Sequence, residues 1–89
     1  MRIKCTVVGD GPGPSEAIVS VSTRDGVEQL VTAKRKLAYN QIEVGEPLAA
    51  EGSASDKMYL VELPRETASG RWRVWVPAAD LSRDLMAAE

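Results

Sequence analysis

The chain has 89 residues, with 11 lysine and arginine residues, 13 aspartate and glutamate residues, and a net charge of −2. This length allows one domain, residues 1–89, with a modest core. The balanced charge gives no overall reason to expect binding to DNA or RNA. A single cysteine and no histidine exclude an internal disulfide and remove the commonest ligand of zinc, copper and haem iron. We therefore expect a cytoplasmic domain without a metal, another cofactor or a membrane segment.

The first third of the sequence shows the alternation of apolar and polar residues that is typical of β-strands. Residues 2–8 and 17–23 alternate with a period of two, and residues 27–33 follow with faces that are less cleanly separated. Residues 24–26 read Arg-Asp-Gly, and an Asp-Gly pair between two β-rich runs indicates a hairpin. We predict a tight turn there, with Gly26 at positive φ.

A glycine- and proline-rich segment, residues 9–14, separates the first two predicted strands. Glycine-rich loops that bind phosphate offer several backbone N–H groups and lead into a helix. Pro12 and Pro14 lack that N–H group, and the next segment has the pattern of a strand. We interpret this segment as a turn.

The rest of the chain predicts three more strands and one helix. Residues 34–40 fit either one helical turn or a loop, and residues 42–44, 58–63 and 71–76 fit strands. Residues 78–89 carry apolar side chains at helical spacing, which predicts a short amphipathic helical tail. Five or six short strands separated by turn signals indicate a small barrel or sandwich.

The run Gly-Arg-Trp-Arg-Val-Trp-Val-Pro-Ala-Ala-Asp-Leu at residues 70–81 resembles the closing segment of SH3-like barrels. In that family the last strand ends in an apolar residue and proline, a single 3₁₀ turn follows, and an aliphatic residue returns to the core. Val76, Pro77 and Leu81 match these places. The resemblance implies an SH3-like barrel. Together with the strand count and the helical spacing of residues 78–89, it leads us to predict a mainly β fold: a small five- to six-stranded antiparallel barrel with a short C-terminal helix.

The last predicted strand holds both tryptophans, and its alternation separates two faces. Trp72, Val74 and Val76 share the face that we predict to be buried. The opposite face, here called the last-strand surface, consists of Arg71, Arg73 and Trp75. The other residues that we predict to lie in the core are Ile3, Cys5, Val7, Val19, Val21, Leu60 and Leu81.

A run of three basic residues, Lys34, Arg35 and Lys36, is a possible accessory patch. Together with the last-strand surface it would combine cations with an aromatic ring, as proteins that bind single-stranded nucleic acid do. The alternative, which we favour, is that Glu62 on the neighbouring strand lies across from an arginine and neutralises it. Trp75 would then be covered by the C-terminal helix or by a partner.

Catalysis has no support in the sequence. Without histidine the usual general base of nucleophilic catalysis is missing. Cys5 lies on the apolar side of its strand, where we predict a small buried residue. We predict no catalytic residue. We predict instead a non-enzymatic interaction module that binds a protein partner or self-associates through the last-strand surface, with Trp75 in a contact between copies. The alternative is a barrel that binds single-stranded nucleic acid.

Overall fold

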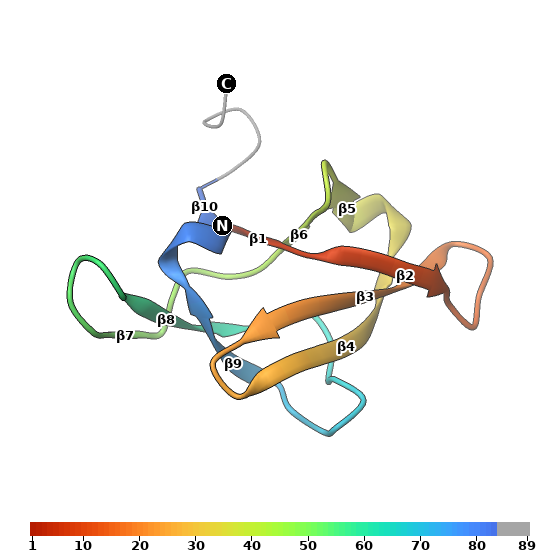
Figure 1. Ribbon diagram of the computed structural model, residues 1–89. Helices are drawn as coiled ribbons and strands as arrows, with labels where there is room; N and C mark the ends of the chain where they lie inside the picture. Colours follow the sequence, from red (N-terminus) through yellow and green to blue (C-terminus); the bar gives the residue numbers. More distant parts are fainter. Residues whose placement is uncertain (84–89) are drawn as a thin grey trace.

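Residues 1–83, which the computed structural model describes, form ten short β-strands and two 3₁₀ turns (Figure 1). In chain order they are β1 (Arg2–Lys4), β2 (Thr6–Asp10), β3 (Glu16–Thr23), β4 (Gly26–Ala33), η1 (Lys34–Lys36), β5 (Leu37–Ala38), β6 (Gln41–Glu43), β7 (Ala49–Glu51), β8 (Met58–Glu62), β9 (Arg73–Pro77), η2 (Ala78–Asp80) and β10 (Leu81–Ser82). All strand pairs are antiparallel. None of the described helical segments is long and apolar enough to cross a membrane.

The strands form three small sheets, with orders β10-β1-β6-β5, β2-β3-β4 and β7-β8-β9. Strands make up 53% of the described chain, so the protein is mainly β, but no sheet closes into a barrel. The predicted barrel is therefore wrong. The physical reason is that the β7-β8-β9 sheet and its β8–β9 loop meet the β2-β3-β4 sheet through isolated backbone contacts and not through a continuous ladder. The Arg24 N–H donates to Trp75 O of β9 (2.9 Å), and the Ala68 N–H of the loop donates to Gln29 O (2.7 Å).

The longest ladder is the hairpin of β3 and β4. Its register runs from Glu16 opposite Ala33 to Thr23 opposite Gly26, so the loop has two residues. Gly26 has φ +119°, and the Thr23 hydroxyl donates a hydrogen bond of 2.6 Å to the Gly26 carbonyl. The predicted turn and the positive φ are confirmed.

The predicted C-terminal helix is wrong where the structure describes that segment. Ala78–Asp80 form only one 3₁₀ turn. Leu81 has extended backbone angles (φ −105°, ψ 131°) and pairs with Ile3 as part of β10. Pairing with the exposed edge of β1 satisfies backbone groups that a helix would have had to satisfy internally. The rest of the predicted helix, residues 84–89, lies outside the described residues.

The core lies where the inner faces of the three sheets meet. Its buried members are Ile3, Cys5, Val19, Val21, Leu30, Ile42, Val61, Leu63, Val74 and Val76, with Leu37, Val44, Tyr59 and Leu81 packed against them. Most of the predicted core is confirmed. The prediction for Leu60 is wrong: it is half-buried and lies across from Trp75, on the face of β8 opposite to the buried Val61. The prediction that Val7 is buried is wrong: 48% of its surface is exposed. The reason is that β2 is an edge strand whose register shifts between Val7 and Gly9.

The prediction that Trp72 lies in the core is also wrong, because 52% of its surface is exposed. Strand β9 begins only at Arg73. Trp72 follows a tight turn in which the Gly70 N–H donates to Thr67 O (2.9 Å) and Gly70 adopts φ +89°. The alternation of a strand cannot be extended through such a turn, so Trp72 does not share the buried face of Val74.

Candidate interaction surface

Strand β9, which carries most of the last-strand surface, lies beside the tip of the β3–β4 hairpin (Figure 1). Arg73 and Trp75 project from the same face of β9, and Arg71 precedes the strand. Both arginines are exposed, whereas Trp75 is half-buried. The hairpin tip brings charged side chains to this surface from a distant part of the sequence.

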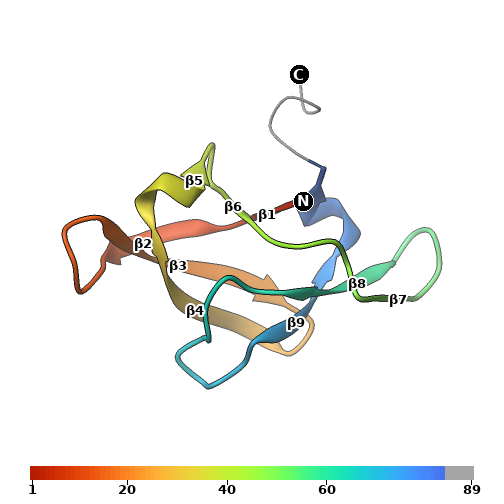
Figure 2. The same ribbon diagram turned by 180° about the vertical axis from the view of Figure 1, so that it is seen from behind.

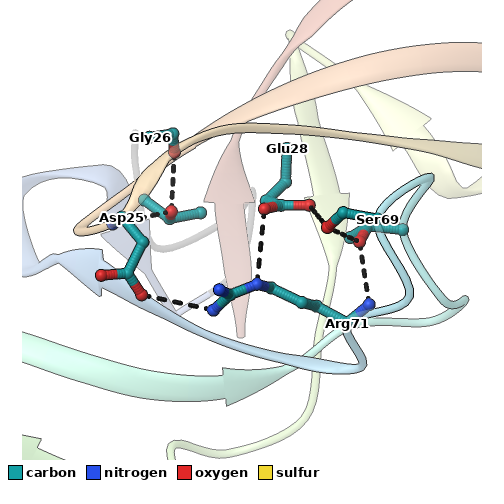
Figure 3. Close-up of polar contacts among 7 residues, drawn as sticks. Asp25, Gly26, Glu28, Ser69 and Arg71 are labelled. Carbon is teal, nitrogen blue, oxygen red and sulfur yellow. Dashed lines mark hydrogen bonds and ion pairs between the residues drawn. The ribbon is translucent and has the colours of Figure 1, made fainter.

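Arg71 is held by two carboxylates of the hairpin (Figure 3). Its Nη1 atom lies 3.3 Å from Asp25 Oδ2, and its Nε atom lies 3.6 Å from Glu28 Oε2. Glu28 also accepts a hydrogen bond of 2.6 Å from the Ser69 hydroxyl, while the Arg71 N–H donates to Thr67 Oγ1 at 3.0 Å. Hydrogen bonds from Ser69 and Thr67, with the charge of Arg71, hold the pKa of Glu28 below its usual value, although burial opposes this.

Arg73 lies directly across from Glu62 in the β8–β9 register. Its Nε atom is 3.4 Å from Glu62 Oε2, and both side chains are more than half exposed. The alternative that we favoured from the sequence, in which Glu62 neutralises an arginine, is confirmed for this pair. An exposed pair of this kind contributes little to stability, but it lowers the net positive charge of the surface.

Trp75 is covered by a third arginine. The guanidinium of Arg24 lies 4.7 Å from the centre of the Trp75 ring, a distance that allows a cation–π interaction. Arg24 Nη1 is in turn 2.7 Å from Glu51 Oε1. Within residues 1–83 the cover over Trp75 thus comes from the hairpin tip and not from the expected helix. Contact of Trp75 with another copy stays a prediction.

Sequence reasoning missed two exposed aromatic residues. Trp72 stands between Arg71 and Arg73 in the chain, and the only signal for its exposure is the glycine that ends the preceding turn. Tyr39 is 85% exposed and has φ +54°, followed by Asn40 with φ +58°. The two residues form the tight turn between β5 and β6. At a positive φ, glycine and asparagine are preferred and the backbone of a bulky residue such as Tyr39 is strained.

The basic run does not join the last-strand surface. Lys34, Arg35 and Lys36 form η1 at the far end of β4, whereas Arg71 contacts Glu28 near the hairpin tip. Glu28 and Ala33, the end of β4, are five residues apart, which corresponds to roughly 17 Å along a strand. The structure therefore separates the two sets of residues that the nucleic-acid hypothesis combined.

Cys5 is buried between β1 and β2 and unpaired. Burial raises the pKa of its thiol, against the opposing charge of Arg2. A raised pKa keeps the sulfur protonated and weakly nucleophilic, which agrees with its packing in the core. Across residues 1–83, no group of three or more histidine, cysteine, aspartate or glutamate residues could hold a metal ion.

Comparisons with protein-family models, with curated proteins and with solved structures find no match for this chain.

Proposed function

We propose that the protein is a non-enzymatic, cytoplasmic interaction module that binds a protein partner through the last-strand surface together with Trp72. The observation that carries this proposal is the exposure of three consecutive residues, Arg71, Trp72 and Arg73. Tryptophan and arginine are the residue types most enriched among those that dominate binding energy. The single unpaired Cys5 suits a reducing compartment.

The charges around these residues favour a protein partner over nucleic acid. Arg71 and Arg73 each have a carboxylate within 4 Å, and Arg24 has Glu51 at 2.7 Å. A phosphate backbone would have to displace these carboxylates or lie beside them, which opposes the ion-pair formation on which nucleic-acid affinity depends. The single-stranded nucleic-acid alternative therefore has less support.

Among possible protein partners, we favour a second copy of this chain. Arginines and carboxylates lie side by side on the surface, so a two-fold arrangement can place an arginine of one copy against a carboxylate of the other. The same rotation brings two copies of Trp72 to the interface and removes both from water. A small domain with a modest core also gains stability from such an association.

The experiment is sedimentation equilibrium of the full chain up to high concentration. We expect a dimer for the wild type and a folded monomer for Trp72→Glu. Leu48→Glu is the matched control, since Leu48 is 51% exposed and precedes β7, on the opposite edge of the sheet from β9; this variant should remain a dimer. A wild type that stays monomeric would contradict the assigned partner, and a complex with a single-stranded oligonucleotide that weakens steeply with salt would favour the alternative.

A further inference from the structure

A cavity with a volume of about 110 Å³ lies at the end of β4, away from the last-strand surface. The segment that follows β8 runs alongside β4 (Figure 2), and it forms one wall of the cavity. The η1 turn forms another. The polar residues that line the cavity are Thr32, Arg35, Lys36 and Arg65.

Three of these four residues are cations, and their charge is largely uncompensated. Neither Arg35 nor Lys36 has an ion-pair partner within residues 1–83, and Arg65 has Glu16 at 3.3 Å. The three arginines around the last-strand surface differ, because each of them has a carboxylate partner. Cations that line one cavity with few counter-charges favour the binding of an anion.

The η1 wall is held in place by a buried arginine. Arg2 Nη2 donates hydrogen bonds of 3.0 Å to Lys36 O and to Gln41 O, and the Arg2 side chain is only 9% exposed. At the other end of the turn, the Lys34 N–H donates to Ser15 O at 2.8 Å. Because both ends are fixed, Arg35 and Lys36 are presented from a rigid backbone, which lowers the entropy lost on binding.

Thr32 supplies an observation that is independent of charge. The residue is buried, and its Oγ1 atom has no hydrogen-bond partner among the described residues. Buried hydroxyl groups in folded proteins are nearly always paired, and an unpaired one calls for an explanation. Thr32 also lines the cavity, and its covered hydroxyl reaches an anion there only when a neighbouring side chain shifts.

We infer that this cavity binds one phosphate group, either as inorganic phosphate or as a phosphate monoester, through Arg35, Lys36 and Arg65 with Thr32 as a further donor. The volume equals that of about four water molecules in the liquid, which suits one tetrahedral anion. The lining contains no aromatic ring, so nothing there would stack on the bases of a polynucleotide. This inference does not depend on the proposed function.

The test is a titration of the full chain with inorganic phosphate, followed by the amide shifts in a nitrogen–proton correlation spectrum. We expect saturable shifts confined to residues 31–36, 65 and 66, with a dissociation constant in the millimolar range. A parallel titration with phosphoserine distinguishes the sources: tighter binding of phosphoserine assigns a monoester, and equal or weaker binding assigns inorganic phosphate.

Variants separate this site from general attraction of anions to the surface. Arg35→Gln should weaken phosphate binding about tenfold or more, the factor that corresponds to about 1.4 kcal/mol, and its exposed side chain should be replaceable without unfolding. Thr32→Val should weaken binding several-fold. Arg73→Gln is the matched control and should leave the affinity unchanged.

Three results would overturn the inference. One is the absence of saturable shifts, and another is an Arg35→Gln variant that binds as well as the wild type. The third is a single-stranded oligonucleotide that binds these residues more tightly than both phosphate and phosphoserine.

Discussion

The network around Glu28 gives the most direct test of how the hairpin is attached to the loop before β9. Glu28 is on β4, and its partners Ser69 and Arg71 lie more than 40 residues later in the chain. Glu28→Gln keeps the shape of the side chain and an oxygen that can accept from Ser69. The variant loses the negative charge and places an amide NH2 group where Glu28 Oε2 faces the Arg71 Nε atom, so its effect reports the loss of the whole contact with Arg71.

The magnitude follows from the difference between charged and neutral hydrogen bonds. A hydrogen bond to a charged group contributes about 1.5–3 kcal/mol and a neutral one about 0.5–1.5 kcal/mol, and the half-exposed Arg71 adds less than about 1 kcal/mol. Because solvent reaches this network, we expect the free energy of unfolding to fall by about 1 kcal/mol at neutral pH. For a domain of this size that corresponds to a melting temperature lower by roughly 4–8 °C.

The pH dependence provides the sharper measurement. The folded pKa of Glu28 lies below its usual value of 4.5, so its contribution to stability is fully present above pH 4.5 and is lost as the pH falls through the folded pKa. Urea denaturation at a series of pH values should show the wild type and Glu28→Gln converging at acid pH. Glu46→Gln, at an exposed residue without an ion pair in residues 1–83, is the control and should match the wild type throughout. A deficit of Glu28→Gln that persists unchanged at acid pH would refute this reasoning.

Three further predictions concern single residues. Trp72→Ala should lower the free energy of unfolding of the monomer by only about 1–2 kcal/mol, because half of the ring is exposed there, while Ile42→Ala in the core should cost about 2–5 kcal/mol. Denaturant titration at a concentration low enough to keep the chain monomeric would contradict this if Trp72→Ala proved the more damaging. Tyr39→Asn should raise the melting temperature by relieving about 1 kcal/mol of left-handed strain, and a lower melting temperature would show that the exposed ring has stabilising contacts. Cys5 should react with a thiol reagent at neutral pH only as fast as the protein opens, and rapid reaction in native buffer would contradict its burial.

Local patterns in the sequence predict the parts of this fold that depend on near neighbours. The Asp-Gly signal at Asp25 and Gly26 predicts the hairpin, since Gly26, the first residue after the two-residue loop, adopts a positive φ that glycine tolerates. The alternation around Ile3, Val19 and Val21 predicts which side chains are buried, because successive strand residues point to opposite faces. These predictions hold wherever the chain stays extended over several residues.

The same reasoning fails where a turn or a pairing partner interrupts the pattern. Trp72 is exposed because β9 begins one residue later, and only the folded turn around Gly70 shows this. Leu81 belongs to a strand because the edge of β1 is available to it. Neither the start of a strand nor the edge that another segment leaves open can be read from residue types alone, since both depend on the packing of distant segments.

The candidate sites divide in the same way. The sequence by itself determined that the chain is mainly β, that histidine-based chemistry is absent, and that arginine and tryptophan gather near residue 72. Only the tertiary structure decided that Asp25 and Glu28 neutralise Arg71, and that Arg65 joins Arg35 at a separate cavity. The physical reason is that electrostatic compensation depends on distances of a few ångströms between side chains, and residues 30 or more positions apart reach those distances only when the chain has folded.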